Sequence, residues 1–178
     1  MPEQSAPWLP PEFEHPERVE VPPGHHLRPI RESDTALDYP AVMGSRDRLW
    51  SMFGPPWGWP PTTMTYEQDQ ADLARHEREA REHRSFNYAV FDSGESRLVG
   101  CVYIDPAERA GADADISWWV VDDEAGGPLE AALADLVPRW ITEHWPFTAP
   151  RFIGRDLTWA QWLALPEIAR PGADPPGA

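Results

Sequence analysis

Three apolar runs in the middle of the chain predict β-strands. They cover residues 86–91, 98–104 and 115–121, and each ends in a short segment rich in Asp, Gly or Pro that is typical of a turn. Because the connections are short, we expect the three strands to form an antiparallel meander. All three runs are apolar on both faces, so helices should cover both sides of the sheet.

Helical spacing of apolar residues predicts two helices before this meander. The first follows a cap in the pair Ser33–Asp34, is interrupted by Pro40 and ends at Gly54. The second begins at Thr65, which fits a capping box with Gln68 three residues later. This second helix is charged nearly all round, so it should lie on the surface and contact the core through a narrow stripe.

A longer helix should follow the meander. Pro128 suits a first helical turn, and apolar residues continue at helical spacing as far as Trp145. Pro138 lies inside this helix and should kink it, because proline removes one backbone hydrogen bond. After it, residues 151–157 are predicted as a further strand and residues 159–165 as a short last helix.

The distribution of proline divides the chain. The 22 prolines among 178 residues exceed the usual share of roughly 5%, and most lie outside the predicted core elements. We therefore interpret residues 1–24 as an extended Pro-rich arm, residues 25–166 as one domain and residues 167–178 as a disordered tail. Three apolar residues of the arm could pin it to the surface of the domain: Trp8, Leu9 and Phe13.

The domain should open with a short strand over residues 26–31. Pro29 within it has no backbone N–H to donate to a neighbouring strand. We therefore expect this strand to lie at an edge of the sheet.

Composition excludes several functional classes. The chain carries 30 acidic residues against 15 basic ones, a net charge of -15, and has no basic block, so we expect no nucleic-acid partner. No apolar run is long enough to span a membrane, and residues 1–11 do not resemble a signal peptide. With Cys101 as its single cysteine, the chain has neither an internal disulfide nor a cysteine-based zinc site. A cytoplasmic protein is the resulting expectation.

The order of elements and three local sequences resemble the GNAT superfamily of N-acetyltransferases. The sequences are LRPIRESD at residues 27–34, LVGCVYI at residues 98–104 and DISWWVVD at residues 115–122, the last followed by Gly-Gly and the long helix. The resemblance covers roughly residues 26–157. It implies an α+β fold in α/β/α layers, with a mixed, mostly antiparallel sheet flanked by helices.

The resemblance implies an acyl-CoA-dependent N-acetyltransferase. Acetyl-CoA would be the co-substrate, and the acidic surface favours a small cationic amine as acceptor. The pantetheine would pair with the strand around Trp119, Val120 and Val121. The pyrophosphate would meet the turn that enters the long helix, at Gly126, Gly127, Pro128 and Leu129.

Two departures from the family pattern keep an alternative open. Asp123 stands where the family usually has Gln or Arg, and it is flanked by Asp122 and Glu124. About 20 residues remain after the last predicted strand, where the family has a further helix and two strands. The alternative is a catalytically inactive GNAT-like domain that binds a ligand or associates with itself, and a homodimer would be one way to complete the sheet.

Asp115 is the candidate general base, because many members of the family carry an acidic residue at this place in the strand. The other interpretation of Asp115 is a partner for a nearby arginine. The loop of Trp57 and Trp59 between prolines is the candidate substrate wall, with a core role as the alternative. We expect no metal, since the His and Glu residues of the charged helix are typical of a solvated face. Cys101 is predicted to be a buried small apolar residue.

Overall fold

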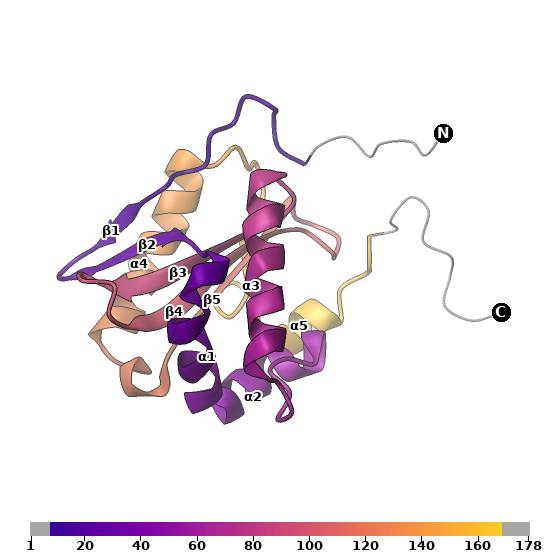
Figure 1. Cartoon of the computed structure of the whole chain (residues 1–178). Coiled ribbons are helices and arrows are strands. Elements are labelled where there is room, and N and C mark those ends of the chain that lie inside the picture. Colours follow the sequence, from indigo (N-terminus) through magenta and orange to yellow (C-terminus); the bar gives the residue numbers. More distant parts are fainter. Residues whose placement is uncertain (1–7, 169–178) are drawn as a thin grey trace, which may run out of the picture.

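The computed structural model describes residues 8–168 and contains one six-stranded sheet in the order β1-β2-β3-β4-β5-β6 (Figure 1). All neighbouring strands are antiparallel except β5 and β6, which run parallel. The strands are β1 (Val19–Val21), β2 (His25–Pro29), β3 (Phe86–Asp92), β4 (Leu98–Pro106), β5 (Ala114–Val120) and β6 (Pro150–Phe152). The predicted meander is confirmed as β3, β4 and β5, whose runs are almost entirely buried.

The first strand of the domain is not at the edge of the sheet, contrary to our expectation. β1, formed from residues that the sequence places in the arm, pairs with His25, His26 and Leu27 of β2. The register of this pair ends before Pro29, which pairs only with Tyr88 of β3 on the other side. Pro29 therefore lies where no strand needs its missing N–H, which is how a proline is accommodated in an inner strand.

The first predicted helix is two helices, and the break is not at Pro40. The helices α1 (Thr35–Gly44) and α2 (Arg46–Trp57) meet at Ser45, whose hydroxyl accepts a hydrogen bond from the backbone N–H of Asp122. α2 continues past Gly54 and ends at Gly58, which has a left-handed φ of 63°. Pro40 is tolerated inside α1, so the local proline rule gave the wrong position for the break.

Helices cover both faces of the sheet, as its doubly apolar strands predict. α1 packs on β4 and α3 (Tyr66–Arg81) packs on β3, whereas α4 (Pro128–His144) covers the opposite face (Figure 1). The capping box of α3 is confirmed, with Thr65 and Gln68 each bonding the other's backbone N–H. A short α5 (Trp159–Leu163) follows β6. The fold is therefore the α+β arrangement of layers expected from the sequence.

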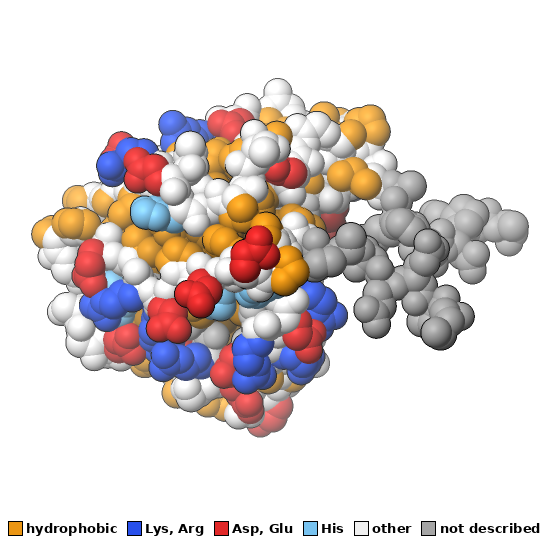
Figure 2. Space-filling view, turned by 90° about the horizontal axis from the view of Figure 1, so that it is seen from above, with side chains coloured by type: hydrophobic (Ala, Val, Ile, Leu, Met, Phe, Trp, Pro, Cys, Tyr) orange, Lys and Arg blue, Asp and Glu red, His pale blue; other side chains and the backbone are white. Residues whose placement is uncertain are grey.

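The described part of the arm is docked on the domain. Leu9 is 2% exposed, the Trp8 indole N–H donates to the carbonyl of Asp113 at 3.0 Å, and Phe13 contacts the ring of Trp145. Figure 2 views the molecule from above and shows an apolar band beside a region of mixed acidic and basic side chains. Of the predicted tail, Glu167 and Ile168 bond to the loop after β4, and the rest lies outside the described residues.

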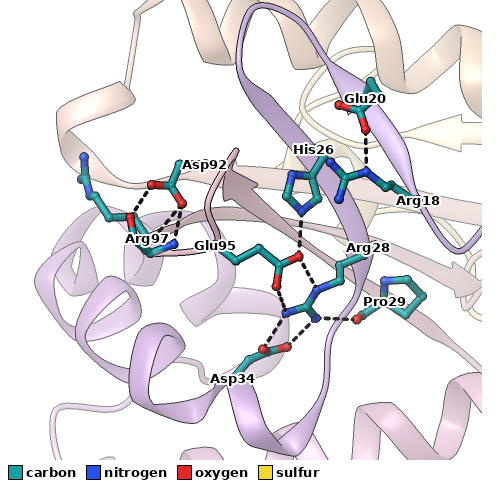
Figure 3. Close-up of polar contacts among 10 residues, drawn as sticks. Arg18, Glu20, His26, Arg28, Pro29, Asp34, Asp92, Glu95 and Arg97 are labelled. Carbon is teal, nitrogen blue, oxygen red and sulfur yellow. Dashed lines mark hydrogen bonds and ion pairs between the residues drawn. The ribbon is translucent and has the colours of Figure 1, made fainter.

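A buried arginine ties β2 to two loops. The Arg28 guanidinium donates to both oxygens of Asp34 at 2.9 and 2.8 Å and to both oxygens of Glu95 at 2.9 Å (Figure 3). The His26 ring nitrogen Nε2 lies 2.8 Å from Glu95. Because Arg28, the first arginine of the LRPIRESD motif, has both carboxylates as partners, it holds the start of α1 and the β3–β4 turn against the sheet.

Candidate functional site

A cavity of about 860 Å³ lies on the face of the sheet that α1, α2 and α3 cover. This volume is in the range of sites for small organic molecules. Its floor is formed by side chains of β3, β4 and β5 that share one face because they are paired in register or two residues apart: Asn87, Tyr103, Asp105, Asp115 and Ser117. Its walls come from α3, from the loop after α2 and from α5.

Asp105 and Asp115 lie directly opposite each other on β4 and β5. Two like charges in this position destabilise a sheet unless one is neutralised. Asp115 is neutralised, since Arg151 Nε donates to its Oδ1 at 2.7 Å and the Trp162 indole N–H donates to its Oδ2 at 3.0 Å. Asp115 is thus an arginine partner, the second of our two interpretations, and its role as a base stays a prediction.

Asp105 differs from Asp115 in its partners. Ser85 Oγ donates to Asp105 Oδ1 at 2.6 Å, and within residues 8–168 no basic side chain forms an ion pair with it. Burial, foremost, raises the pKa of this carboxyl to about 6. A carboxyl with such a pKa is ionised at neutral pH and is basic enough to accept a proton from a substrate.

A pair of buried carboxyl groups forms another part of the cavity wall. Asp38 of α1 and Asp69 of α3 are joined by a hydrogen bond in which Asp69 is the acceptor. Burial and the neighbouring charge raise the pKa of Asp38 far above its ordinary value, and burial raises that of Asp69 to about 6. Cys101 Sγ lies 3.9 Å from Asp38, is buried as predicted, and has a pKa raised by burial. The pair therefore keeps a proton to higher pH than ordinary carboxyl groups do.

Aromatic side chains form the rest of the wall. Trp57 and Trp59 both line the cavity, where the sequence places a substrate wall, and Trp57 stacks on Phe53 of α2. Tyr103 Oη accepts a hydrogen bond from the Trp119 indole N–H at 2.8 Å, so the hydroxyl proton of Tyr103 is available to another acceptor. Burial raises the pKa of Tyr103 well above its ordinary value, so the hydroxyl stays protonated.

β5 and β6 separate after a short parallel pairing that ends at Ile116 and Phe152. On the β6 side of β5, the carbonyl of Ile116 accepts a hydrogen bond from the backbone N–H of Ile153 at 2.9 Å. On the β4 side, the backbone N–H of Val121 donates to the carbonyl of Val99 at 2.9 Å. Because the backbone N–H and C=O groups of successive residues alternate sides along a strand, those of Trp118 and Val120 point into the opening between β5 and β6. Of the three predicted pantetheine residues, Val120 therefore faces the opening, and its carbonyl accepts from Arg48 Nη2. Trp119 and Val121 turn their backbone groups toward β4.

In the turn before α4, a backbone N–H group already donates to a carboxylate of the same helix. Gly126 adopts a φ of 71°, and its N–H donates to the Glu130 carboxylate at 2.5 Å. The predicted residues Gly127, Pro128 and Leu129 follow it into the helix. The three acidic residues before the turn form a 3-10 helix, Asp122–Glu124. Arg48 Nε lies 2.7 Å from Asp122, and Arg97 lies 3.9 Å from Asp123, so two of the three carboxylates have a cation nearby.

Sequence reasoning missed the acidic residues Asp38, Asp69 and Asp105. Each lies within or at the end of an element predicted for other reasons, and only the fold brings them to one cavity. A signal was present at Asp69, a charged residue on the same side of its helix as Leu73, where an apolar residue is expected. Of the helix residues considered for a metal, His76 and Glu79 line the cavity, whereas His83 contacts His15 of the arm.

Comparison with known proteins identifies the fold. A family model described as "Acetyltransferase (GNAT) domain" matches residues 26–164. An acetyltransferase of Salmonella typhimurium that modifies the N-terminal serine of ribosomal protein L7/L12 superposes with a TM-score of 0.57 at 13% identity, over 71% of this chain and 68% of that one. The ribosomal-protein-S5-alanine acetyltransferase of Vibrio fischeri gives 0.51 at 17% identity, over 72% and 66%.

A third solved structure is an acetyltransferase that confers self-immunity to microcin C7, in complex with acetyl-CoA and AMP. It superposes with a TM-score of 0.56 at 11% identity, over 71% of this chain and 67% of that one. At these identities the likeness concerns the fold alone. No curated protein sequence matches the chain. Within residues 8–168 no helix combines the length and the apolar character needed to cross a bilayer.

Proposed function

This chain belongs to the GNAT acetyltransferase family, and on that premise we propose that it transfers an acetyl group from acetyl-CoA to a small cationic amine. Acetyl-CoA supplies a thioester carbonyl, to which the nitrogen of the amine adds as the carbon–sulfur bond breaks. The acceptor enters the cavity on the α3 face, and the co-substrate enters the opening between β5 and β6.

The observation that carries the proposal is the charge of the cavity. Asp38, Asp69 and Asp105 all line it, and within the described chain none of them has a basic ion-pair partner. Buried carboxyl groups without a partner are costly, and a cationic ligand offsets this cost. The indole faces of Trp57 and Trp59 add a surface that attracts cations.

Asp105 is the residue that we propose as proton acceptor for the attacking amine. Its pKa of about 6 suits this task at neutral pH, and its position opposite Asp115 on the cavity floor leaves it accessible to a ligand. Asp115 remains the second candidate, although its two oxygens are engaged by Arg151 and Trp162. Tyr103 Oη holds a proton beside them and is the proposed proton donor to the leaving sulfur.

The described residues fit a bound acetyl-CoA in two places. The backbone groups of Trp118 and Val120 at the opening are suited to pair with the pantetheine amides. The N–H of Gly126 is suited to a phosphate, because it already binds the carboxylate of Glu130. Gly127, Pro128 and Leu129 continue this proposed site into the first turn of α4.

The same turn favours a second candidate function, a GNAT-like domain that binds a ligand without catalysis. Asp122, Asp123 and Glu124 repel a pyrophosphate, and Glu130 competes with it for Gly126. The two candidates differ in one measurable property, which is the affinity of the chain for acetyl-CoA.

Isothermal titration with acetyl-CoA tests the proposal. We expect binding, and we expect Glu130→Gln to tighten it several-fold, because the substitution removes a competing negative charge from Gly126. Glu143→Gln is the matched control, since it removes the same charge from the exposed carboxyl end of the same helix. Absence of binding to both the wild type and Glu130→Gln at millimolar acetyl-CoA would overturn the acetyltransferase proposal and leave the non-catalytic candidate.

Release of free thiol in the presence of amines then tests the chemistry. We expect Asp105→Asn to lower kcat by about a hundredfold or more and to remove the rise of activity through pH 6. An Asp115→Asn enzyme that keeps its stability but loses that rise, while Asp105→Asn retains it, would assign the base to Asp115.

The oligomeric state is a separate part of the proposal. β6 is the last strand of the sheet and is only three residues long, so a second copy of the chain could pair with this edge. Light scattering at micromolar concentration checks this, and a monomer would remove the dimer from consideration.

A further inference from the structure

Apart from the bond that the carboxyl group of Asp38 donates to Asp69, two buried side-chain oxygen atoms in the cavity have no hydrogen-bond partner within residues 8–168. They are Oδ2 of Asp69, a residue 2% exposed, and Oδ1 of Asn87, a residue 5% exposed. Both residues line the cavity, and they come from different elements, α3 and β3. Buried acceptors of this kind are rare in folded proteins, and two of them in one cavity indicate a ligand that donates several hydrogen bonds.

The charge around these atoms specifies the donor. Asp38 and Asp69 share a hydrogen bond, and within the described chain neither has a basic ion-pair partner. The carboxylates farther along α3 are different, because Asp72 and Glu79 both pair with Arg75. A ligand that offers several N–H donors together with positive charge therefore suits both the unpaired acceptors and the carboxyl pair, and ammonium groups supply such donors.

This place is separate from the proposed proton acceptor. Asp38 contacts Cys101, which is four residues before Asp105 on β4. At the rise of a β-strand, this spacing corresponds to roughly 13 Å along the strand. An ammonium group held between Asp38 and Asp69 is therefore too far away to contact Asp105. Asn87 lies between the two places, because it pairs with Tyr103, two residues before Asp105, and all of these residues line the same cavity.

We propose that Asp38 and Asp69 form a subsite for a second, non-reacting ammonium group, and that Asn87 accepts a hydrogen bond between this subsite and Asp105, so that the preferred substrate is an extended polyamine. The inference rests on the proposed function only in assigning the reacting amine to Asp105; the subsite itself is a binding property. The nitrogen near Asp105 is acetylated while the distant ammonium group holds the polyamine in the cavity. A spermidine-length amine should therefore bind better than 1,4-diaminobutane, and both better than butylamine.

Binding should release a proton. An ammonium group favours the ionised form of the carboxyl pair, so it lowers pKa values that burial raises in its absence. The other titratable groups that act on the pair are Asp34, Asp72, His76, Cys101 and Tyr103. Of these groups, only His76 can carry a positive charge. Because burial raises the pKa of Asp69 to about 6, raising the pH through 6 ionises this carboxyl and should strengthen polyamine binding.

Calorimetric titration of the full chain with spermidine and with butylamine tests the subsite. Titrations near pH 6 in two buffers of different ionisation enthalpy also give the number of protons released. We expect Asp69→Asn, which keeps the shape of the side chain, to weaken spermidine binding about tenfold or more and to abolish proton release. Butylamine binding should change less than twofold. Glu67→Gln is the matched control, because it removes the same charge from an exposed position of α3.

The outcomes separate the subsite from the proposed function. Equal affinity for spermidine and butylamine, or unchanged spermidine binding in Asp69→Asn, overturns the subsite even when acetyl transfer occurs. Selective spermidine binding with proton release that Asp69→Asn abolishes supports the subsite even when no amine is acetylated, and in that case only the proposed function fails.

Discussion

Individual buried charges in this protein fall into two groups. Arg28 has Asp34 and Glu95 as partners, and Asp115 has Arg151 and Trp162. These partnered groups hold loops and strands together, as bidentate contacts do. Asp38, Asp69 and Asp105 have no basic ion-pair partner within the described chain, and all three line the cavity. This difference distinguishes carboxylates with a structural role from those that we propose bind a ligand.

The Arg28 network predicts a pH dependence of stability. The hydrogen bond from Arg28, foremost, and that from His26 lower the pKa of Glu95 from 4.5 to about 2. The unfolded chain therefore binds more protons in this range, so the contribution of Glu95 is complete above pH 4.5 and is lost as the pH falls toward 2. We expect Glu95→Gln to have a lower Tm than the wild type at pH 7 and an equal Tm near pH 2.

Thermal unfolding of both proteins from pH 2 to 7 measures this difference. Glu67→Gln, at an exposed position of α3, serves as the control and should follow the wild type throughout. A Tm difference for Glu95→Gln that does not change with pH would contradict the role assigned to Glu95.

At the scale of elements, β4 and β5 approach each other too closely for a side chain at one position. A Cβ added to Gly100 would lie 2.3 Å from the carbonyl oxygen of Trp119, which is a backbone atom and cannot move aside. The position therefore requires glycine because of its neighbour strand and not because of its own φ.

We expect Gly100→Ala to lower the free energy of unfolding by about 2 kcal/mol, because the strands must move apart to admit the methyl group. Urea denaturation measures the change. Gly94→Ala is the control, since a Cβ there meets open space, and it should stay within about 0.5 kcal/mol of the wild type. Equal midpoints for the two variants would mean that the approach of β4 and β5 is looser than described.

At the scale of the whole molecule, the described part of the arm, residues 8–24, contributes to the core. Leu9 is 2% exposed, Trp8 stacks on Phe147, and Tyr88 of β3 donates to the carbonyl of Pro16 at 2.6 Å. The arm thus joins the start of the chain to the segment after α4. This proline-rich segment has few apolar residues, but it contributes to the fold because those residues pack against an aromatic surface.

Leu9→Ala tests the docking of the arm. We expect a loss of about 2–4 kcal/mol in the free energy of unfolding, the usual cost of truncating a buried leucine. Glu12→Ala, an exposed position of the same segment, should have little effect. A change below about 0.5 kcal/mol for Leu9→Ala in denaturant titration would mean that the arm is not docked in solution.

Much of the fold could be predicted from local pattern. The meander, the capping box at Thr65 and the last helix lie close to their predicted places, because each depends on neighbours within a few residues. The break between α1 and α2 was misplaced, since Ser45 is held by Asp122, a residue distant in sequence. The position of β2 inside the sheet was missed for the same reason, because β1 has no strong pattern of its own.

The sequence by itself determined the order of elements, the family resemblance and the excess of acidic charge, since these are properties of neighbours and of composition. Only the tertiary structure decided which carboxylates matter. It paired Asp115 with Arg151, and it brought Asp38, Asp69 and Asp105 from three elements into one cavity, where none of the three has an ion-pair partner within the described residues. The physical reason is that the pKa and the unmet hydrogen bonds of a carboxyl depend on what surrounds it in space, and residues far apart in the chain supply those surroundings.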